Sequence, residues 1–358
     1  MRRRIGALLL AACCLIGGIW ISAGAEMQKR TMYFFDTFDT MITIIGYTES
    51  QATFDRITGQ AREEFVRLHK LFDAYHEYEG IQNVFTLNRD ATAAPVEVSP
   101  ELMGLLTFAK EWQPKLQGSV NIALGAALRL WHEYRTEGTQ NPNSAKLPPM
   151  AQLQDLAGHG DFVSIVLDRE KSTVYFSDPK VKLDVGAVAK GYATEWVAQM
   201  LLASDMPNFI LNAGGNVRTG NPPLDGRKHW GVSIQDPDSA LGTGVGEEVA
   251  EVFYLSNLSV VTSGDYERFY VVDGVRYHHI ISPETLMPAT ENRAITVVCE
   301  DSGLADILST AVFVLPYDRA RALIESIEGA EALWIRPDGE ILLTDGLKAM
   351  SKSGGATN

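Results

Sequence analysis

The chain has 358 residues, of which 46% are hydrophobic and 21% are charged, so it can bury one large core or two intimate subdomains. Its formal net charge is −14 at pH 7, and the first 25 residues contain three arginines and no acid, so the remainder is more acidic than the whole. This charge argues against nucleic acid as a partner, because nucleic acid requires a basic surface. It also disfavours an anionic membrane, and an anionic ligand would need nearby cations or backbone N–H groups.

The first 25 residues have the features of an export signal. Three arginines at residues 2–4 precede an uncharged apolar run over residues 5–25, which ends in a small-x-small cleavage site. Two alternatives remain: Cys13 ends a lipobox and would be lipidated, or the uncut segment spans the bilayer. We expect an exported, periplasmic protein, either free or anchored to the inner membrane. Two of the three cysteines lie in this segment and only Cys299 follows it, so an internal disulfide is excluded there. We expect Cys299 to be a buried thiol.

Hydrophobic periodicity predicts the elements of the remaining chain. Helical spacing predicts helices at residues 51–72, 99–134 (two helices broken at 114–118), 188–203, 302–313 and 317–327. Alternating or short apolar runs predict strands at residues 32–46, 163–168, 173–177, 209–211, 230–234, 251–255, 258–262, 267–272, 275–281 and 293–299, with a meander over the run that begins at 251. Composition predicts loops at 136–150 and 236–249 and a disordered tail over 347–358.

The stretch from Lys182 to Glu195 starts as a strand, turns at Gly186 and continues as a helix. This arrangement places free backbone N–H groups at the positive end of a helix dipole, where a phosphate binds well. Asp184 ends the strand and is a candidate acceptor for ligand hydroxyls, and Lys190 is a candidate partner for a phosphate or an acidic group. The alternative is an ordinary strand–helix corner in which Asp184 caps the helix.

Asp306 and Thr310 are four residues apart on a predicted helix, so their side chains share one face. A carboxylate and a hydroxyl are the hard oxygen ligands that Mg²⁺ prefers. The alternative is that Asp306 caps the helix near Ser302. The residue types therefore indicate a metal site without excluding a structural role.

Several segments resemble, in the same order, the motifs of the ApbE family of flavin transferases. They are K-x-D-x-G-x-x-A-K-G-Y at 182–192, N-x-G-G-[DN] at 212–216, T-S-G-D-Y-x-R at 262–268, H-H-I-x-[DN]-P at 278–283 and D-x-L-S-T-A at 306–311. Residues 35–37 resemble the family's M-[DG]-T, with Phe35 in place of Met, and residues 72–75 its F-[SD]-x-Y. The largest departure lies at 120–125, where Asn121 and Ala123 replace an Asp and a Thr.

The resemblance implies an α+β fold over residues 31–346, with mixed or antiparallel sheets, flanking helices, and FAD bound between two intimate subdomains. It implies a metal site in which the backbone carbonyl of Ala187 joins Asp306 and Thr310. The residues that match family positions near FAD are Phe35, Tyr75, Asp184, Lys190, Gly214, Gly215, Ser263, Arg268 and His279.

The resemblance also implies an enzyme that transfers FMN from FAD to a threonine hydroxyl of a target protein with Mg²⁺, releasing AMP. The acceptor would be a subunit of a membrane redox complex. Asp306 and His279 would be catalytic: imidazole titrates near neutrality, so His279 is the candidate base, whereas His278 would point to the other side of a strand. The alternative bases are Asp265 and a hydroxide on the metal, and His279 would then be structural.

Two other functions remain open on the sequence. The same metal and phosphorus would serve a Mg²⁺-dependent FAD pyrophosphatase that releases FMN and AMP. The third candidate is a non-catalytic periplasmic flavin-binding protein, which the altered segment at 120–125 favours and which the presence of Asp306, Thr310 and His279 opposes.

Overall fold

The computed structural model describes residues 26–240 and 248–358. The expected export signal, with Cys13 and its lipobox, and most of the expected loop at 236–249 lie outside the described residues. No helix within the described ranges is both long and apolar enough to cross a membrane.

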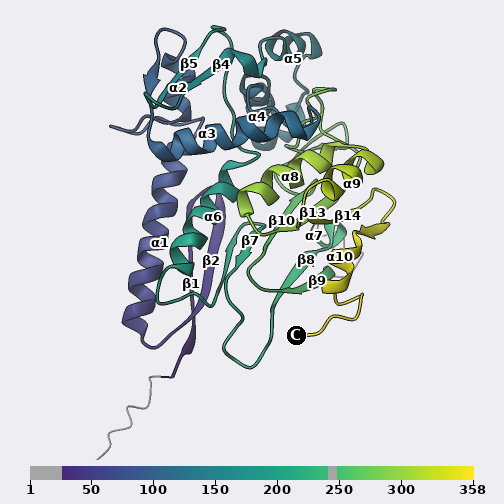
Figure 1. Cartoon of the computed structure of the whole chain (residues 1–358). Coiled ribbons are helices and arrows are strands. Elements are labelled where there is room, and N and C mark those ends of the chain that lie inside the picture. The colour runs from purple at the N-terminus through teal and green to yellow at the C-terminus, as the bar shows by residue number, and fades with distance from the viewer. Residues whose placement is uncertain (1–25, 241–247) are drawn as a thin grey trace, which may run out of the picture.

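An eight-stranded sheet, antiparallel at every pairing, forms the centre of the molecule (Figure 1). In spatial order its strands are β1 (Gln28–Thr37), β2 (Thr40–Thr48), β6 (Phe209–Ala213), β7 (Asn216–Thr219), β10 (Ser259–Gly264), β13 (Ala294–Cys299), β14 (Glu331–Ile335) and β15 (Ile341–Leu343). The smaller sheets are β3 (Val96–Glu97), β5 (Thr173–Phe176) and β4 (Ile165–Asp168), then β8 (Trp230–Gln235) with β9 (Val249–Leu255), and β11 (Tyr270–Val272) with β12 (Val275–Tyr277).

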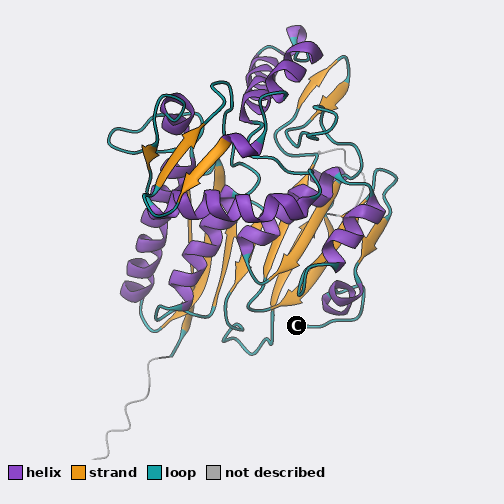
Figure 2. Ribbon diagram, turned by 45° about the horizontal axis from the view of Figure 1, so that its top comes forward, coloured by secondary structure: helices purple, strands orange, loops and turns teal. Residues whose placement is uncertain are grey.

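Helices cover one face of the large sheet, as Figure 2 shows. These helices are α1 (Gln51–Phe72), α6 (Ala189–Leu202), α8 (Ser302–Val314) and α9 (Tyr317–Glu325). Their apolar residues share a core with the sheet, as where Phe65 and Val197 join Ile44 and Val297. The β8–β9 hairpin and α10 (Asp345–Met350) cover the other face over β7, β10, β13 and β14. A second core lies between them and the sheet.

A second layer lies above the large sheet in Figure 1. It contains α2 (Val84–Asp90), α3 (Pro100–Trp112), α4 (Gly125–Gln140), α5 (Met150–Ala157) and the β3-β5-β4 sheet; the remaining short helices are α7 (Pro237–Ala240), η1 (Gln113–Leu116), η2 (Pro142–Ser144) and η3 (Phe162–Ser164). The main core continues from the large sheet into α3 and β5 through Leu105 and Val174. The two parts are therefore closely joined, as expected for an α+β fold with flanking helices.

The predicted helices form where their spacing placed them. Helix α1 begins at the predicted residue because the side chain of Ser50 accepts the backbone N–H of Thr53 and caps its first turn. The two helices expected within residues 99–134 are α3 and α4, but α4 continues to Gln140 and shortens the loop that was predicted to begin at 136.

Three strand predictions are wrong. The stretch that begins at Lys182 does not start as a strand, and Lys182 makes only an isolated bridge with Leu124. Residues 32–46 form parts of two strands, because Phe38 and Asp39 adopt left-handed backbone angles (φ 52° and 51°) and turn the chain between β1 and β2. The strands after residue 251 are not a meander: β9 pairs with β8, and β10 pairs with β7 and β13. The first half of β10 is fully buried, as in a central strand, whereas β9 alternates buried and half-buried residues and covers a sheet with one face.

The prediction of a disordered tail over 347–358 is also wrong. Leu347 is fully buried in the second core, and the chain continues alongside β9, where the N–H of Lys352 donates to the carbonyl of Val252 (2.9 Å). The side chain of Ser353 donates to the carboxylate of Glu251. The segment is too short for periodicity to show that it packs against a distant strand.

Candidate active site

A cavity of about 1040 Å³ lies where the two parts of the fold meet. Both parts line it: Tyr75 and Arg135 come from the segments around α1 and α4, and Ser263 and Thr310 come from β10 and α8. This volume is at the upper end of the range for small-molecule sites, which reach about 1,000 Å³. The cavity is therefore large enough for a dinucleotide.

The cavity contains all but two of the residues expected to contact the ligand or the metal, but not Asp265, the alternative base, which pairs with Arg293. It is lined by Tyr75, Asp184, Ala187, Lys190, Gly214, Ser263, Arg268, His279, Asp306 and Thr310. Phe35 is not among them: it is 66% exposed on β1, and Phe38, Asp39 and Thr40 of the following turn line the cavity instead. Gly215 also lies outside the cavity. Its positive φ (88°) allows the turn between β6 and β7, and its carbonyl accepts the N–H of Thr262. Neither Phe35 nor Gly215 lines the cavity, and their expected contacts with a ligand stay predictions.

Asp184 faces the cavity and does not cap α6. Its Oδ1 accepts the N–H of Gly186 (2.8 Å), and its Oδ2 accepts the hydroxyl of Tyr75 (3.0 Å). Val188 is the N-cap residue of α6, which has no side-chain cap. The capping alternative is thus excluded, and burial together with Asp184 raises the pKa of Tyr75, which keeps this phenol neutral and donating.

Lys190 ties α6 to the glycine turn between β6 and β7. Its Nζ donates to the carbonyl of Gly214 (2.5 Å). Burial lowers the pKa of this lysine, and the nearby carboxylates of Asp306 and Glu267 oppose the shift. Lys190 therefore brings one cation to the cavity beside the residues of the expected metal site.

Helices α6 and α8 approach closely at Gly191. A Cβ atom on this residue would collide with Asp306 and with the carbonyl of Ser302, so only glycine allows the contact. The N–H of Gly191 donates to Oδ2 of Asp306 (2.7 Å), and Asp306 is only 6% exposed. Asp301 caps α8 by accepting the N–H of Leu304, which excludes the capping alternative for Asp306.

The residues beside this contact fit a hard cation. Burial raises the pKa of Asp306, and Lys190 lowers it, so a cation at this carboxylate would offset the cost of its buried charge. Thr310 and Ala187 line the same cavity and supply neutral oxygens. Among residues 26–240 and 248–358 there is no cluster of three or more His, Cys, Asp or Glu side chains able to hold a metal, so ligand oxygens and water would complete the shell, as Mg²⁺ commonly accepts.

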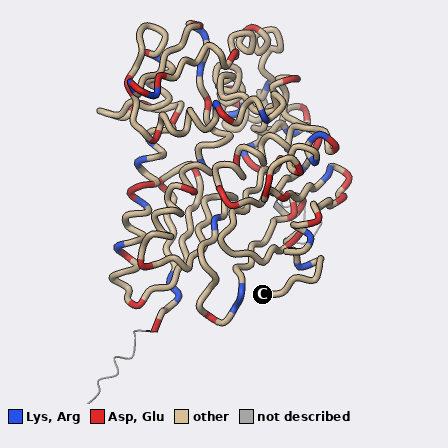
Figure 3. The backbone as a smooth tube through the Cα atoms, viewed as in Figure 1, with Lys and Arg blue, Asp and Glu red and all other residues tan. Residues whose placement is uncertain are grey.

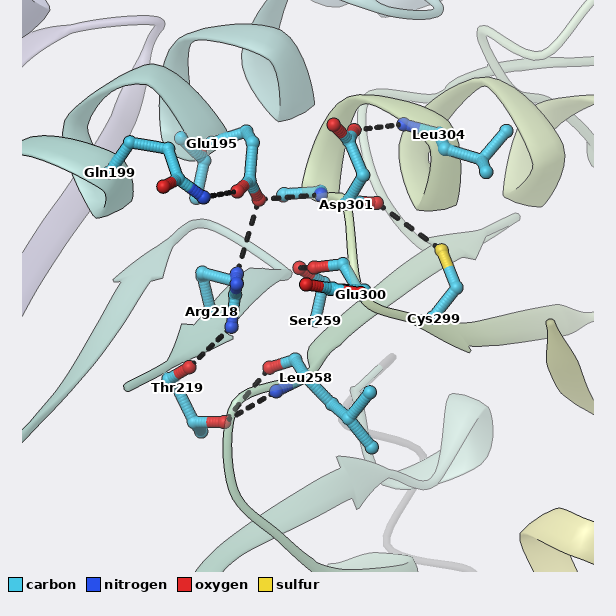
Figure 4. A network of polar contacts seen from close by, with 12 residues as sticks. Glu195, Gln199, Arg218, Thr219, Leu258, Ser259, Cys299, Glu300, Asp301 and Leu304 are labelled. Atoms are coloured by element: carbon cyan, nitrogen blue, oxygen red, sulfur yellow. Dashed lines mark hydrogen bonds and ion pairs between the residues drawn. The ribbon is translucent and has the colours of Figure 1, made fainter. Parts of the chain in front are cut away.

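A buried ion pair joins α6 to β7 one turn further along α6 (Figure 4). Nε of Arg218, which is 1% exposed, lies 3.1 Å from Oε2 of Glu195. This oxygen also accepts the N–H of Ser302, the first residue of α8 (2.9 Å). Glu195 therefore connects α6, β7 and α8, on which the expected metal ligands depend.

His279 and His278 are separated as predicted, although β12 ends before them. His279 lines the cavity, with Nδ1 3.3 Å from the carbonyl of Glu267. Burial, and then the charges of Arg268 and Arg135, hold the pKa of His279 well below its usual value. His278 is buried outside the cavity with Nε2 2.8 Å from the carbonyl of Ala289, which is a structural role.

Two cavity residues on α4, His132 and Arg135, were not predicted from the sequence. The ring of His132 lies against that of Tyr75, with centroids 4.5 Å apart and planes at 32°. A guanidinium nitrogen of Arg135 lies 3.0 Å from Nδ1 of His132. The available signal was their i,i+3 spacing beside the apolar Trp131, but the predicted helix ended at residue 134, one residue before Arg135.

Replacing Glu195 tests the connection between the helices. We expect Glu195→Ala to lower the free energy of unfolding by about 3–5 kcal/mol, because it leaves the Arg218 guanidinium buried and unpaired. Glu195→Gln should lose less, since its amide oxygen still accepts both N–H groups. Urea unfolding measures this, with Glu133→Ala, which breaks the exposed pair with Arg129, as the control. Equal losses for Glu195→Ala and the control would contradict the assignment.

Comparisons with known proteins agree with this geometry. Residues 38–334 match the model of the ApbE family. The chain is 35% identical over 357 residues to a FAD:protein FMN transferase of Treponema pallidum (strain Nichols), covering 96% of this chain and 94% of that protein. It is also similar to the crystal structure of the ApbE protein of Thermotoga maritima (TM-score 0.77, 30% identity, 90% and 99% of the two chains). A flavin transferase ApbE from Vibrio cholerae shares the fold (TM-score 0.75, 21% identity, 90% and 100%). The chain therefore belongs to the ApbE family.

Proposed function

We propose that the protein is a Mg²⁺-dependent FAD:protein FMN transferase, which moves FMN from FAD to a threonine hydroxyl of an acceptor protein and releases AMP. The observation that carries the proposal is the buried Asp306, beside Thr310, in a cavity large enough for a dinucleotide. The relatives that are named FAD:protein FMN transferase support this substrate and this transfer.

Asp306, Thr310 and the carbonyl of Ala187 are the residues that would hold Mg²⁺ in this cavity. When bound, Mg²⁺ would neutralise charge on the pyrophosphate and withdraw electrons from its phosphorus. Gly191 keeps Asp306 in place through its N–H, and Lys190 adds a positive charge nearby. These fixed groups lower the cost of bringing a polyanion into an acidic protein.

The transfer exchanges one phosphorus–oxygen bond for another. The acceptor hydroxyl oxygen forms a bond to the phosphorus of the FMN half, the bond from that phosphorus to the bridging oxygen breaks, and AMP leaves with that oxygen. The hydroxyl proton goes to His279, which lines the cavity and is neutral because its protonated form is disfavoured by burial and by Arg268 and Arg135. Tyr75, with its hydroxyl held by Asp184, offers a flat ring surface to the ligand.

The reaction is proposed to occur outside the cytoplasm, on a subunit of a membrane redox complex. Its support is the sequence of residues 1–25, with arginines followed by an uncharged apolar run. Fractionation of cells that express the full chain tests this location. Recovery of the protein in the cytoplasm alone would refute export, whereas release from membranes only by detergent would indicate an anchored form.

Incubation of the protein with FAD, Mg²⁺ and an acceptor domain tests the transfer. We expect the acceptor to gain the mass of FMN less water, AMP to appear in equal amount, and EDTA to stop both. Asp306→Asn should slow the reaction by about 100-fold or more, because it removes the buried charge that holds the cation. Asp318→Asn, an exposed change on α9, is the control. Free FMN and AMP without an adduct would instead identify a pyrophosphatase, and intact bound FAD would identify a flavin-binding protein.

His279→Gln tests the proposed base. We expect it to lower the rate of transfer by about 10²–10⁴-fold, with exposed His229→Gln as the control. A base acts when it is unprotonated, so a lowered pKa keeps His279 active as the pH falls through the ordinary imidazole range. The pH profile of kcat/KM for FAD should therefore lose activity from this group only well below about 6.5. An unchanged profile in His279→Gln would assign the base to another residue.

A further inference from the structure

Two arginines in the cavity have no carboxylate partner. Within the described ranges, neither Arg135 nor Arg268 forms an ion pair, although acids outnumber bases in this chain and both kinds lie close together throughout the fold (Figure 3). Other partly or fully buried arginines are paired: Arg218 with Glu195, and Arg293 with two aspartates. An unpaired cation in a cavity is costly unless a ligand supplies the anion.

The two arginines come from opposite parts of the fold. Arg135 lies on α4 in the upper layer, and Arg268 lies in the segment between β10 and β11. They are near enough that, after burial, the charge of Arg268 is the largest influence lowering the pKa of Arg135. Two like charges that face one cavity form a site for an anion placed between them.

A hydrogen bond holds the side chain of Arg135, and the backbone of Arg268 is strained. Because guanidinium only donates, Nδ1 of His132 accepts the hydrogen bond from Arg135 (3.0 Å), and burial followed by Arg135 lowers the pKa of His132, which keeps the imidazole neutral. His132 in turn lies against Tyr75. Arg268 has a positive φ (42°), a backbone conformation that costs a non-glycine residue about 1 kcal/mol or more and that collects at functional sites.

We infer that Arg135 and Arg268 form a two-sided phosphate subsite that holds the pyrophosphate of FAD, with Arg135 as a binding residue that distinguishes FAD from unphosphorylated flavin. The inference rests on the proposed function. The planar guanidinium suits the geometry of phosphate oxygens. Arg135 lies on α4, outside the recognised motifs.

A series of flavins that differ only in phosphate content tests the subsite. Affinities for riboflavin, FMN and FAD are measured by fluorescence titration, with and without Mg²⁺, on wild-type protein and on Arg135→Gln. We expect the Kd for FAD to rise about 10- to 100-fold in the variant, as for the loss of a charged hydrogen bond, while the Kd for riboflavin stays within about twofold. Arg135→Lys should recover part of the loss, since it restores the charge but not the planar fork.

Arg129→Gln is the matched control, because Arg129 lies on the same helix, pairs with Glu133 and does not line the large cavity. Its affinities should equal those of the wild type. Equal losses for riboflavin and FAD in Arg135→Gln would show that the residue acts on the ring or on the fold, and unchanged FAD affinity would also overturn the inference. A wild type that binds FAD but transfers no FMN would refute the proposed function alone, since the binding series remains readable.

Discussion

The close contact between α6 and α8 is the constraint on which the site depends. Gly191 lets α8 approach until the N–H of Gly191 reaches the carboxylate of Asp306. One turn further along α6, Glu195 accepts the N–H of Ser302 at the start of α8 and pairs with Arg218 of β7. Lys190 on α6 also reaches the glycine turn of the sheet. One short helix thus holds in place the carboxylate proposed to bind the metal, a lysine and the glycine turn beside the cavity.

Electrostatics explains how an acidic protein binds an anionic dinucleotide. Most charged residues that the structure describes lie at the surface, where solvent screens them and an ion pair contributes little. The cavity instead contains cations without carboxylate partners among the described residues, namely Arg135 and Arg268, together with Lys190, which is bonded to a carbonyl. In a partly desolvated cavity these charges act strongly, so the binding of phosphate depends on a local field that the net charge does not reveal.

Local patterns predicted the elements well and their pairing poorly. The bounds of α1, α6 and α8 follow from apolar spacing, because each helix buries one stripe against the sheet. The face that Phe35 occupies could not be predicted, since Tyr33, Phe34 and Phe35 are all aromatic and only contact with Phe65 shows that Phe34 points inward. Strand order likewise depends on contacts between segments that lie far apart in the chain.

The sequence by itself determined the family, through the order of its motifs, and the i,i+4 spacing of Asp306 and Thr310 predicted two hard oxygen donors on one helix face at a candidate cation site. Only the tertiary structure decided which further side chains face that site. His132 and Arg135 join it because α4 packs across the cavity. Phe35 does not line it, because Phe35 lies on the exposed side of β1 whereas Phe34 packs inward against Phe65. Spacing along the sequence determines which residues are neighbours within one helix, whereas packing of the core determines which separate helices and strands come into contact.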